Sequence, residues 1–269
     1  MTRPLVFSSL LCVMMFVAYA DAQQASPNFA SADPPSFEVA SIKPSRPGSG
    51  NHNWDSSTDR VTIENYSLRD LIASAYGLKS NAQVMGGLQW LDKMHFDIAA
   101  KVDDAEVAKL RSLTPLDQSK EWNLMLQSLL ADRFGLKVSR GERTIPVYAL
   151  VIAKSGIKLT PAAANETDHR ISGNSAHMTA TATSMDALAD DLTTMPESDN
   201  RVVVNRTGLT IEYDFKLDWT RDRGNGIPED AKYPGFFTAL REQLGLELKP
   251  GTGLVSVVVV EAAIEPALD

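Results

Sequence analysis

Apolar residues are spaced in helix-like and strand-like patterns along this chain, and the patterns follow the same order in both halves. In the first half, apolar residues recur every three or four positions after the helix-capping Ser67 and again before Gly135, which predicts two helices. Two-residue alternation over 37–42 and 96–102 predicts strands. Each half therefore reads as strand–helix–strand–strand–helix–strand–strand.

The second half also repeats particular residues of the first. The stretch 67–71 returns as 184–188, which is 117 positions later (184 − 67). An aromatic–Asp–apolar step at 96–98 returns as 213–215, again 117 positions later (213 − 96). Gly135, between two apolar residues, returns as Gly245 after 110 positions (245 − 135). An internal repeat of this kind predicts two related lobes rather than one large domain.

We therefore predict an α+β fold of two tandem related lobes, each with small mixed sheets around a helix pair. Each lobe is expected to close with a hairpin, the first joining strands 136–140 and 147–153, the second joining 246–248 and 255–262. The predicted parts are a signal peptide over 1–22, a flexible tether over 23–36, a first α+β lobe over 37–154, a linker over 155–175 and a second α+β lobe over 176–265.

The first residues have the pattern of an export signal. Arg3 precedes an apolar run over 5–18, and small residues at the end of the run predict cleavage after Ala20 or Ala22. The run is shorter than the roughly 20 residues of a membrane span, so we expect membrane contact only through this leader during export. The single cysteine, Cys12, lies within it, so the mature chain has no disulfide. We expect an exported protein, periplasmic or extracellular.

Charge and ligand spacing limit the possible roles. The formal net charge of −8 would repel phosphate backbones, and no basic stripe is present, so we expect no nucleic-acid partner. The four histidines share no metal-ligand spacing, and we expect no metal and no cofactor. His52 with Asp55 and Asp59 is the alternative, a cation site in the polar loop predicted over 44–59; a solvated loop is favoured.

Two sets of residues suggest catalysis, but neither forms a convincing site. Asp97 and Asp214 occupy equivalent places in the repeat, where paired carboxylates could exchange protons, but their symmetry favours a structural cap. Separately, Ser155 and Lys158 match the S-x-x-K pattern of penicillin-recognising enzymes, and 198–200 matches their S-D-N element. The glycine after Ser155 disfavours the helix that such a nucleophile requires, so chance similarity is favoured.

Aromatic residues in polar surroundings are the candidates for contact with a partner. Trp54 lies beside His52 in a polar stretch where burial is not expected. Tyr233 and Phe236 lie in or next to the polar loop over 221–234. We predict these four residues as interaction candidates.

Several motifs together resemble a known family. They are 37–44 (FEVASIKP), 129–138 (LLADRFGLKV), 146–151 (PVYALV) and 207–215 (TGLTIEYDF). They are similar to DUF3738, a large family of exported proteins of unknown function that is abundant in soil acidobacteria. The resemblance covers about 36–265, although Asn205-Arg206 stands where the family usually has Asp-Lys. Family members also form the outer part of membrane-bound peptidase sensors, and the resemblance implies no catalytic residues.

The order of elements in each lobe is also similar to the short periplasmic domain of secretins and TonB-dependent receptors, which implies docking. We accordingly expect a non-enzymatic binding module for a protein or peptide. The alternatives are a sensor domain that binds a small molecule or cell-wall fragment between the lobes, and a hydrolase of unrecognised type.

Overall fold

A computed structural model of the chain describes residues 34–46, 50, 52–166, 168–174, 176–222 and 224–266. Pro34–Asp269 forms one compact unit, and the description below concerns this unit. The predicted signal peptide and residues 23–33 of the predicted tether lie outside the described residues. In the described part, no helix is long and apolar enough to cross a membrane.

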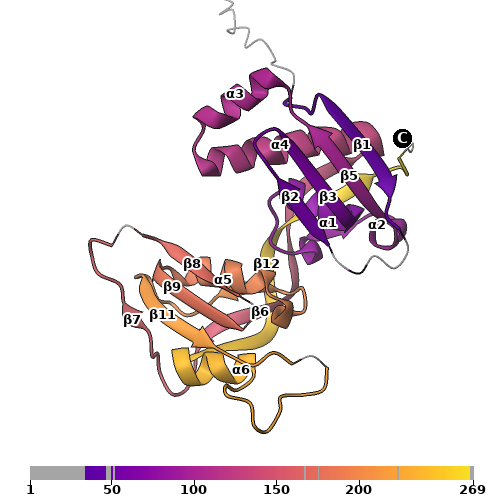
Figure 1. Cartoon of the computed structure of the whole chain (residues 1–269). Helices are drawn as coiled ribbons and strands as arrows, with labels where there is room; N and C mark the ends of the chain where they lie inside the picture. Colours follow the sequence, from indigo (N-terminus) through magenta and orange to yellow (C-terminus); the bar gives the residue numbers. More distant parts are fainter. Residues whose placement is uncertain are drawn as a thin grey trace, which may run out of the picture. The chain divides into compact units, whose positions relative to one another are not determined.

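Helices and small sheets alternate along the unit, so the predicted α+β class is confirmed (Figure 1). The first half contains β1 (Val39–Pro44), β2 (Asn53–Ser56), β3 (Arg60–Ser67), α1 (Leu68–Ala75), η1 (Asn81–Gln83), β4 (Val84–Gly86), α2 (Trp90–Lys93), β5 (His95–Lys101), α3 (Asp104–Ser112), α4 (Pro115–Phe134) and β6 (Lys137–Ile152). The second half contains β7 (Thr160–Pro161), β8 (Arg170–Asn174), β9 (His177–Thr183), α5 (Met185–Thr194), η2 (Pro196–Ser198), β10 (Val202–Asn205), β11 (Tyr213–Asp218), α6 (Phe236–Ala239), the π-helical turn η3 (Leu240–Leu244) and β12 (Leu246–Ala262).

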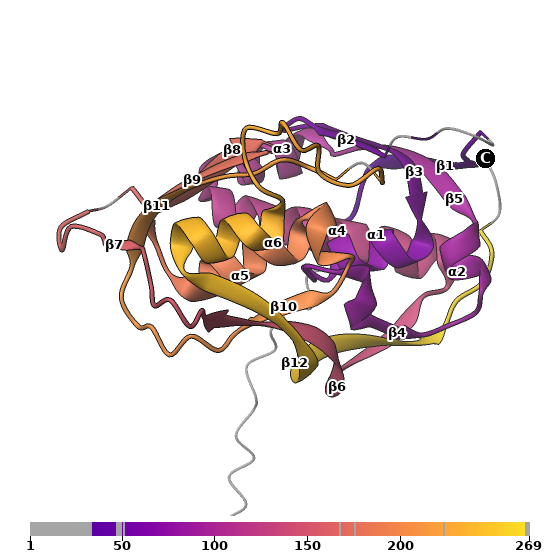
Figure 2. The same cartoon turned by 90° about the horizontal axis from the view of Figure 1, so that it is seen from below.

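The internal repeat is visible in the sheets. The first sheet has the strand order β1-β5-β3-β2, and the second sheet has the matching order β7-β11-β9-β8. A shared sheet, with the order β10-β6-β12-β4, joins the two halves. In Figure 2 the main helices lie between the shared sheet on one side and the first and second sheets on the other.

The two hairpins predicted at the ends of the lobes are wrong. β6 and β12 are continuous strands that pair with each other over almost their whole length. The expected turn at 141–144 is instead extended backbone, in which Gly141 pairs with Val257 and Arg143 with Val255. A tight hairpin needs positive φ angles in its turn, and no residue of 141–144 has one. The residues of each predicted hairpin form one continuous strand, β6 or β12, and these two strands pair with each other.

The long ribbon of β6 and β12 has an approximate twofold centre. Thr144 pairs with Leu254, and these residues are also repeat equivalents, since 254 − 144 = 110. Away from this centre the two halves of each strand serve different cores. Leu150, at one end of β6, belongs to the second core, whereas Val138, at the other end, packs against the first. The tandem arrangement of separate lobes is therefore not confirmed.

Four apolar clusters hold the described part of the unit together, and the smallest of them, at α3 (Asp104–Ser112) and α4, consists of Val102, Val107, Leu110 and Met125. The first core lies under α1 and α4 and includes Leu71, Phe96 and Phe134. The second core lies under α5 and α6 and includes Leu188 and Trp219. A third, smaller cluster lies on the shared sheet, where its buried members are Ile145, Val147, Val202, Val255 and Val257. Burial of a whole aliphatic side chain contributes about 1.5–3 kcal/mol, so the ribbon links two substantial cores.

Two segments that were expected to be irregular contain strands. The predicted linker over 155–175 contributes β7 and β8, which pair with β11 and β9 of the second sheet. The polar loop predicted over 44–59 contains β2, which pairs with β3. All four β2 residues are exposed, so the apolar alternation that identifies a half-buried strand is missing from the sequence. The short helix α2 and the helix α3 are further elements that the pattern did not predict.

Candidate functional site: an aromatic pocket beside an edge strand

One wall of a small pocket is formed by the first sheet. Trp54 pairs with Ile63 and Ser56 with Val61 across the β2–β3 ladder, so the four side chains point to the same face of the sheet. Val61 and Ile63 are buried, whereas Trp54 is 40% exposed. The wall therefore runs from a closed apolar floor to an open aromatic rim.

The opposite wall is one face of α4. Ser119, Trp122, Asn123 and Leu126 line the pocket, and their spacing of three and four positions places them on one side of a helix. Phe37, which precedes β1, closes one end with its ring centroid 5.8 Å from that of Trp122. The enclosed volume is about 200 Å³.

The rim of the pocket continues into a chain of aromatic rings. Trp54 meets Tyr66 edge to face at 5.7 Å, and His52 lies 5.1 Å from the same ring. His95 follows at 6.1 Å from His52. Burial, and secondarily the Asp70 carboxylate, raises the pKa of Tyr66. The structure thus brings the predicted candidates Trp54 and His52 together.

The chemistry of the pocket suits an uncharged occupant. None of its nine lining residues is ionisable, and their polar side-chain groups are the hydroxyls of Ser56 and Ser119, the amide of Asn123 and the indole N–H groups of Trp54 and Trp122. A site for acid–base or nucleophilic catalysis would need a titratable group within hydrogen-bond reach. Among the described residues, no group of three or more His, Cys, Asp or Glu could hold a metal ion.

The pocket opens beside a free sheet edge. β2 is the terminal strand of the first sheet, and in the described part of the chain no strand pairs with its outer side. Such an edge presents unpaired N–H and C=O groups that can pair with another chain.

The other pair of predicted candidates does not form a comparable surface. Phe236 is only 4% exposed and packs against Trp219 in the second core, which corrects its prediction as an interaction residue. Its neighbour Phe237 is 46% exposed. Tyr233 is half-buried, and the ammonium group of Lys232 lies 4.8 Å from the centre of its ring. The sequence alone does not show which of two adjacent aromatic residues at a helix start is buried, because this depends on which side of the helix faces the core.

The repeated carboxylates have a structural role. Asp97 accepts a hydrogen bond from the backbone N–H of Asn65 at 2.9 Å, and Asp214 accepts one from Ala182 at 2.8 Å. Asn65 and Ala182 are repeat equivalents, and both have positive φ angles, 63° and 41°. Each carboxylate therefore satisfies a backbone donor at an irregular point in its sheet, as the favoured interpretation expected.

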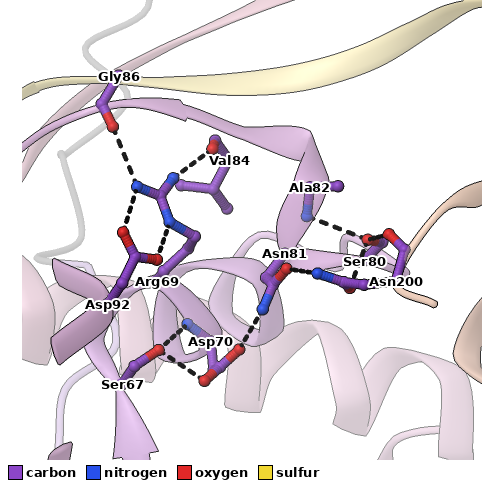
Figure 3. A network of polar contacts seen from close by, with 10 residues as sticks. All are labelled: Ser67, Arg69, Asp70, Ser80, Asn81, Ala82, Val84, Gly86, Asp92 and Asn200. Atoms are coloured by element: carbon purple, nitrogen blue, oxygen red, sulfur yellow. Dashed lines mark hydrogen bonds and ion pairs between the residues drawn. The ribbon is translucent and has the colours of Figure 1, made fainter. Parts of the chain in front are cut away.

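A polar contact joins the two halves on another side of the first core (Figure 3). Ser80 donates to the backbone carbonyl of Asn200 at 2.5 Å, and the Asn200 side chain donates to that of Asn81. Asn81 in turn donates to Asp70 at 2.8 Å. An open cleft of about 570 Å³ lies beside this contact, with Lys79 also on its lining. Asn200 belongs to the stretch 198–200 that matches the S-D-N pattern, and its contacts join the two halves.

Arg69 of α1 holds both ends of β4. Its guanidinium donates to the carbonyls of Val84 and Gly86 and pairs with Asp92 (Figure 3). The first residue of the S-D-N element, Ser198, is fully buried and donates to the Leu192 carbonyl. It is therefore a structural hydroxyl and is not exposed to a substrate.

Comparison with known protein families identifies the family of this chain. The model of DUF3738, a family described as proteins of unknown function, matches residues 69–263. The chain belongs to this family. The family match begins after β2, so the Trp54 wall of the pocket lies outside the matched region, whereas the α4 wall lies inside it. No curated protein and no solved structure matches the chain.

Proposed function

We propose that this DUF3738 protein is a non-enzymatic binding module that docks an extended peptide segment of a partner protein. The segment adds a strand to the free edge of β2 and places one uncharged apolar side chain in the pocket next to Trp54. Strand addition derives affinity from main-chain hydrogen bonds and specificity from pockets for alternate side chains. The observation that carries the proposal is the aromatic pocket directly beside an unpaired edge strand.

The size of the pocket favours a single side chain over a whole ligand. Pockets for small molecules usually enclose about 300–1,000 Å³. The pocket beside β2 encloses about 200 Å³, and its floor is apolar. Because side chains alternate along a strand, every second residue of an added peptide would face the pocket side.

The internal repeat supplies a second argument. A residue or helix segment of the pocket that is missing from the equivalent place in the second half is not required by the shared fold. Trp54 pairs with Ile63, and its repeat equivalent Ile171 pairs with Ala180 in the same register. The fold therefore accepts a smaller aliphatic residue at the position of Trp54. Similarly, α4 begins at Pro115, whereas the second-half helix begins at Phe236, the equivalent of Leu126 (236 − 110). The pocket wall before Leu126 has no helical counterpart, so the pocket is an addition to the repeated plan.

The setting of the proposed function is export. The N-terminal pattern supports a periplasmic or extracellular protein, in which the partner would be another envelope or secreted protein. The similarity of each half to the docking domain of secretins and TonB-dependent receptors, and the family's association with soil acidobacteria, fit this role and are part of the proposal. Cofactors and nucleic acids have no place in it.

The test is selection from a displayed library of random peptides against the chain from residue 23 onward. We expect enrichment of extended peptides with a large apolar residue flanked at alternate positions. Their binding should weaken at least tenfold in Trp54→Ala and stay unchanged in Phe237→Ala, which removes a similarly exposed aromatic ring. Bound peptide should also slow amide exchange within β2. Enriched peptides that bind both variants equally, or that leave β2 exchange unchanged, would refute the proposal.

A second candidate function rests on the cleft at the junction of the halves. Its volume of about 570 Å³ and its hydroxyl and amide lining, with Ser74, Ser80 and Asn200, suit a small polar molecule or cell-wall fragment. Soluble muropeptides provide the test, because binding through this cleft should be lost in Asn200→Ala and retained in Trp54→Ala. The opposite pattern, or no binding, would remove this candidate.

A further inference from the structure

A third surface carries basic side chains that the proposed peptide site does not use. Four of them line one open depression of about 630 Å³ in the second half: Lys154, Lys158, Arg241 and Lys249. They come from three segments, namely the turn after β6, the η3 helix and β12. Two acidic residues, Glu242 and Glu247, also line it, so the depression carries a formal charge of +2 (four minus two). The whole chain, in contrast, carries −8.

The charges in this depression are only partly neutralised. Lys158 donates to the backbone carbonyl of Glu242 at 2.6 Å, and Lys249 lies 3.7 Å from the carboxylate of Glu247. Within the part of the chain that the structure describes, the side chains of Lys154 and Arg241 form no hydrogen bond or ion pair. Lys154 and Arg241 thus face the same depression without a direct ion-pair partner, although the carboxylates of Glu242 and Glu247 share its lining.

The repeat indicates that two of the four cations, Arg241 and Lys249, are not needed for folding. The first-half equivalents of Arg241 and Lys249, 110 positions earlier, are Ala131 and Ser139. Gly135 and Gly245 end the two helices with similar positive φ angles of 53° and 66°, although Ala131 lies in the α-helix α4 and Arg241 in the π-helical turn η3. At these two positions the second copy therefore carries basic residues where the first copy folds with uncharged ones.

We propose that this depression binds a phosphate group. Two unpaired cations match a dianion, and a phosphate monoester carries about −1.5 to −2 at neutral pH, whereas a carboxylate carries only −1. The planar fork of Arg241 suits two phosphate oxygens, and Lys154 adds a point charge. Ser155, on the same lining, offers a hydroxyl donor. The side chain of Glu242 is the one opposing charge on the lining without a cationic partner, and it limits the affinity.

The probe is inorganic phosphate, titrated into the isotope-labelled chain from residue 23 onward at low ionic strength and followed by NMR. We expect saturable shifts confined to amides of 154–158 and 241–249. Arg241→Gln and Lys154→Gln should each weaken binding by about tenfold, the factor expected when one charge-assisted hydrogen bond is lost. Glu242→Gln should strengthen binding, because it removes the opposing carboxylate. Lys216→Gln, which removes an exposed lysine from β11 on another surface, is the matched control and should have no effect.

Several outcomes would overturn the phosphate site. Acetate shifting the same amides with equal affinity would show that the depression does not distinguish a dianion from a monoanion. Equal weakening by Lys216→Gln would reduce the effect to the overall charge of the chain. Weaker binding in Glu242→Gln would contradict the assigned role of that carboxylate. Because all the substituted side chains are exposed, circular dichroism should find every variant folded, so a loss of binding reports on the site itself.

Discussion

Replacement of Asp214 by alanine tests whether the repeated aspartates hold the sheets together. Asp214 is half-buried and accepts a 2.8 Å hydrogen bond from the backbone N–H of Ala182, which is 1% exposed. The substitution leaves this N–H without its partner at a place that water reaches poorly. Loss of a hydrogen bond to a charged group costs about 1.5–3 kcal/mol. We therefore expect the free energy of unfolding to fall by roughly that amount.

The assay is urea unfolding at pH 7, supported by thermal melting. A unit of this size, 236 residues (269 − 33), loses about 2–4 °C of Tm per kcal/mol, so the expected shift is roughly 3–12 °C. Asp97→Ala should cost a similar amount, because Asp97 makes the equivalent bond to Asn65. The control is Asp132→Ala, an exposed carboxylate on α4 that should change stability by less than about 0.5 kcal/mol.

The result that refutes this reasoning is a pair of variants, Asp97→Ala and Asp214→Ala, as stable as Asp132→Ala. In that case the repeat would preserve these carboxylates for a reason other than the sheet irregularity. A catalytic or binding role would then return as the better explanation of their symmetry.

Three further predictions concern local strain, pH and cooperativity. Asp199→Gly should stabilise the chain by about 0.5–1 kcal/mol in urea unfolding, because Asp199 has a φ of 49° that glycine adopts without strain, whereas Asp199→Ala should destabilise it. Burial raises the pKa of Asp191, and Lys79 acts in the opposite direction. Ionisation of Asp191 therefore destabilises the folded state as pH rises through that pKa. Asp191→Asn should raise Tm at pH 7 and leave it unchanged at pH 3. Leu188→Ala and Leu71→Ala, in different cores, should each cost about 2–5 kcal/mol and each keep a single calorimetric transition, and two transitions would show that the halves unfold separately.

The sequence predicts those elements whose residues carry their own local signal. Ser67 and Ser184 cap α1 and α5 as expected, and Gly135 and Gly245 end the following helices. These features depend only on neighbouring residues, so a pattern within one turn is enough to identify them. The 117-residue spacing likewise predicts the equivalence of the two halves.

The pairing of β6 with β12 could not be predicted in the same way. A strand at 137–140 can form a hairpin with 147–152, or it can continue and pair with a strand more than 100 residues later. Both arrangements bury the same alternate residues, so hydrophobic periodicity does not distinguish them. The candidate site shows a similar limit: Trp54 and His52 were identified by their unusual setting, but the α4 wall opposite them depends on tertiary packing that no local pattern encodes.

The shared ribbon also explains why differences between the two halves are informative. Each core needs strands from both β6 and β12, so neither half can lose its share of the ribbon without damage to the other. Folding therefore constrains the repeated positions in both copies, which is consistent with equivalent caps, core residues and sheet order. Positions that differ, such as Trp54 against Ile171 and Arg241 against Ala131, lie outside that constraint. Because these two differences lie at separate surface depressions, one apolar and one cationic, a single partner could use both only if it carried an extended apolar segment and a phosphate group together.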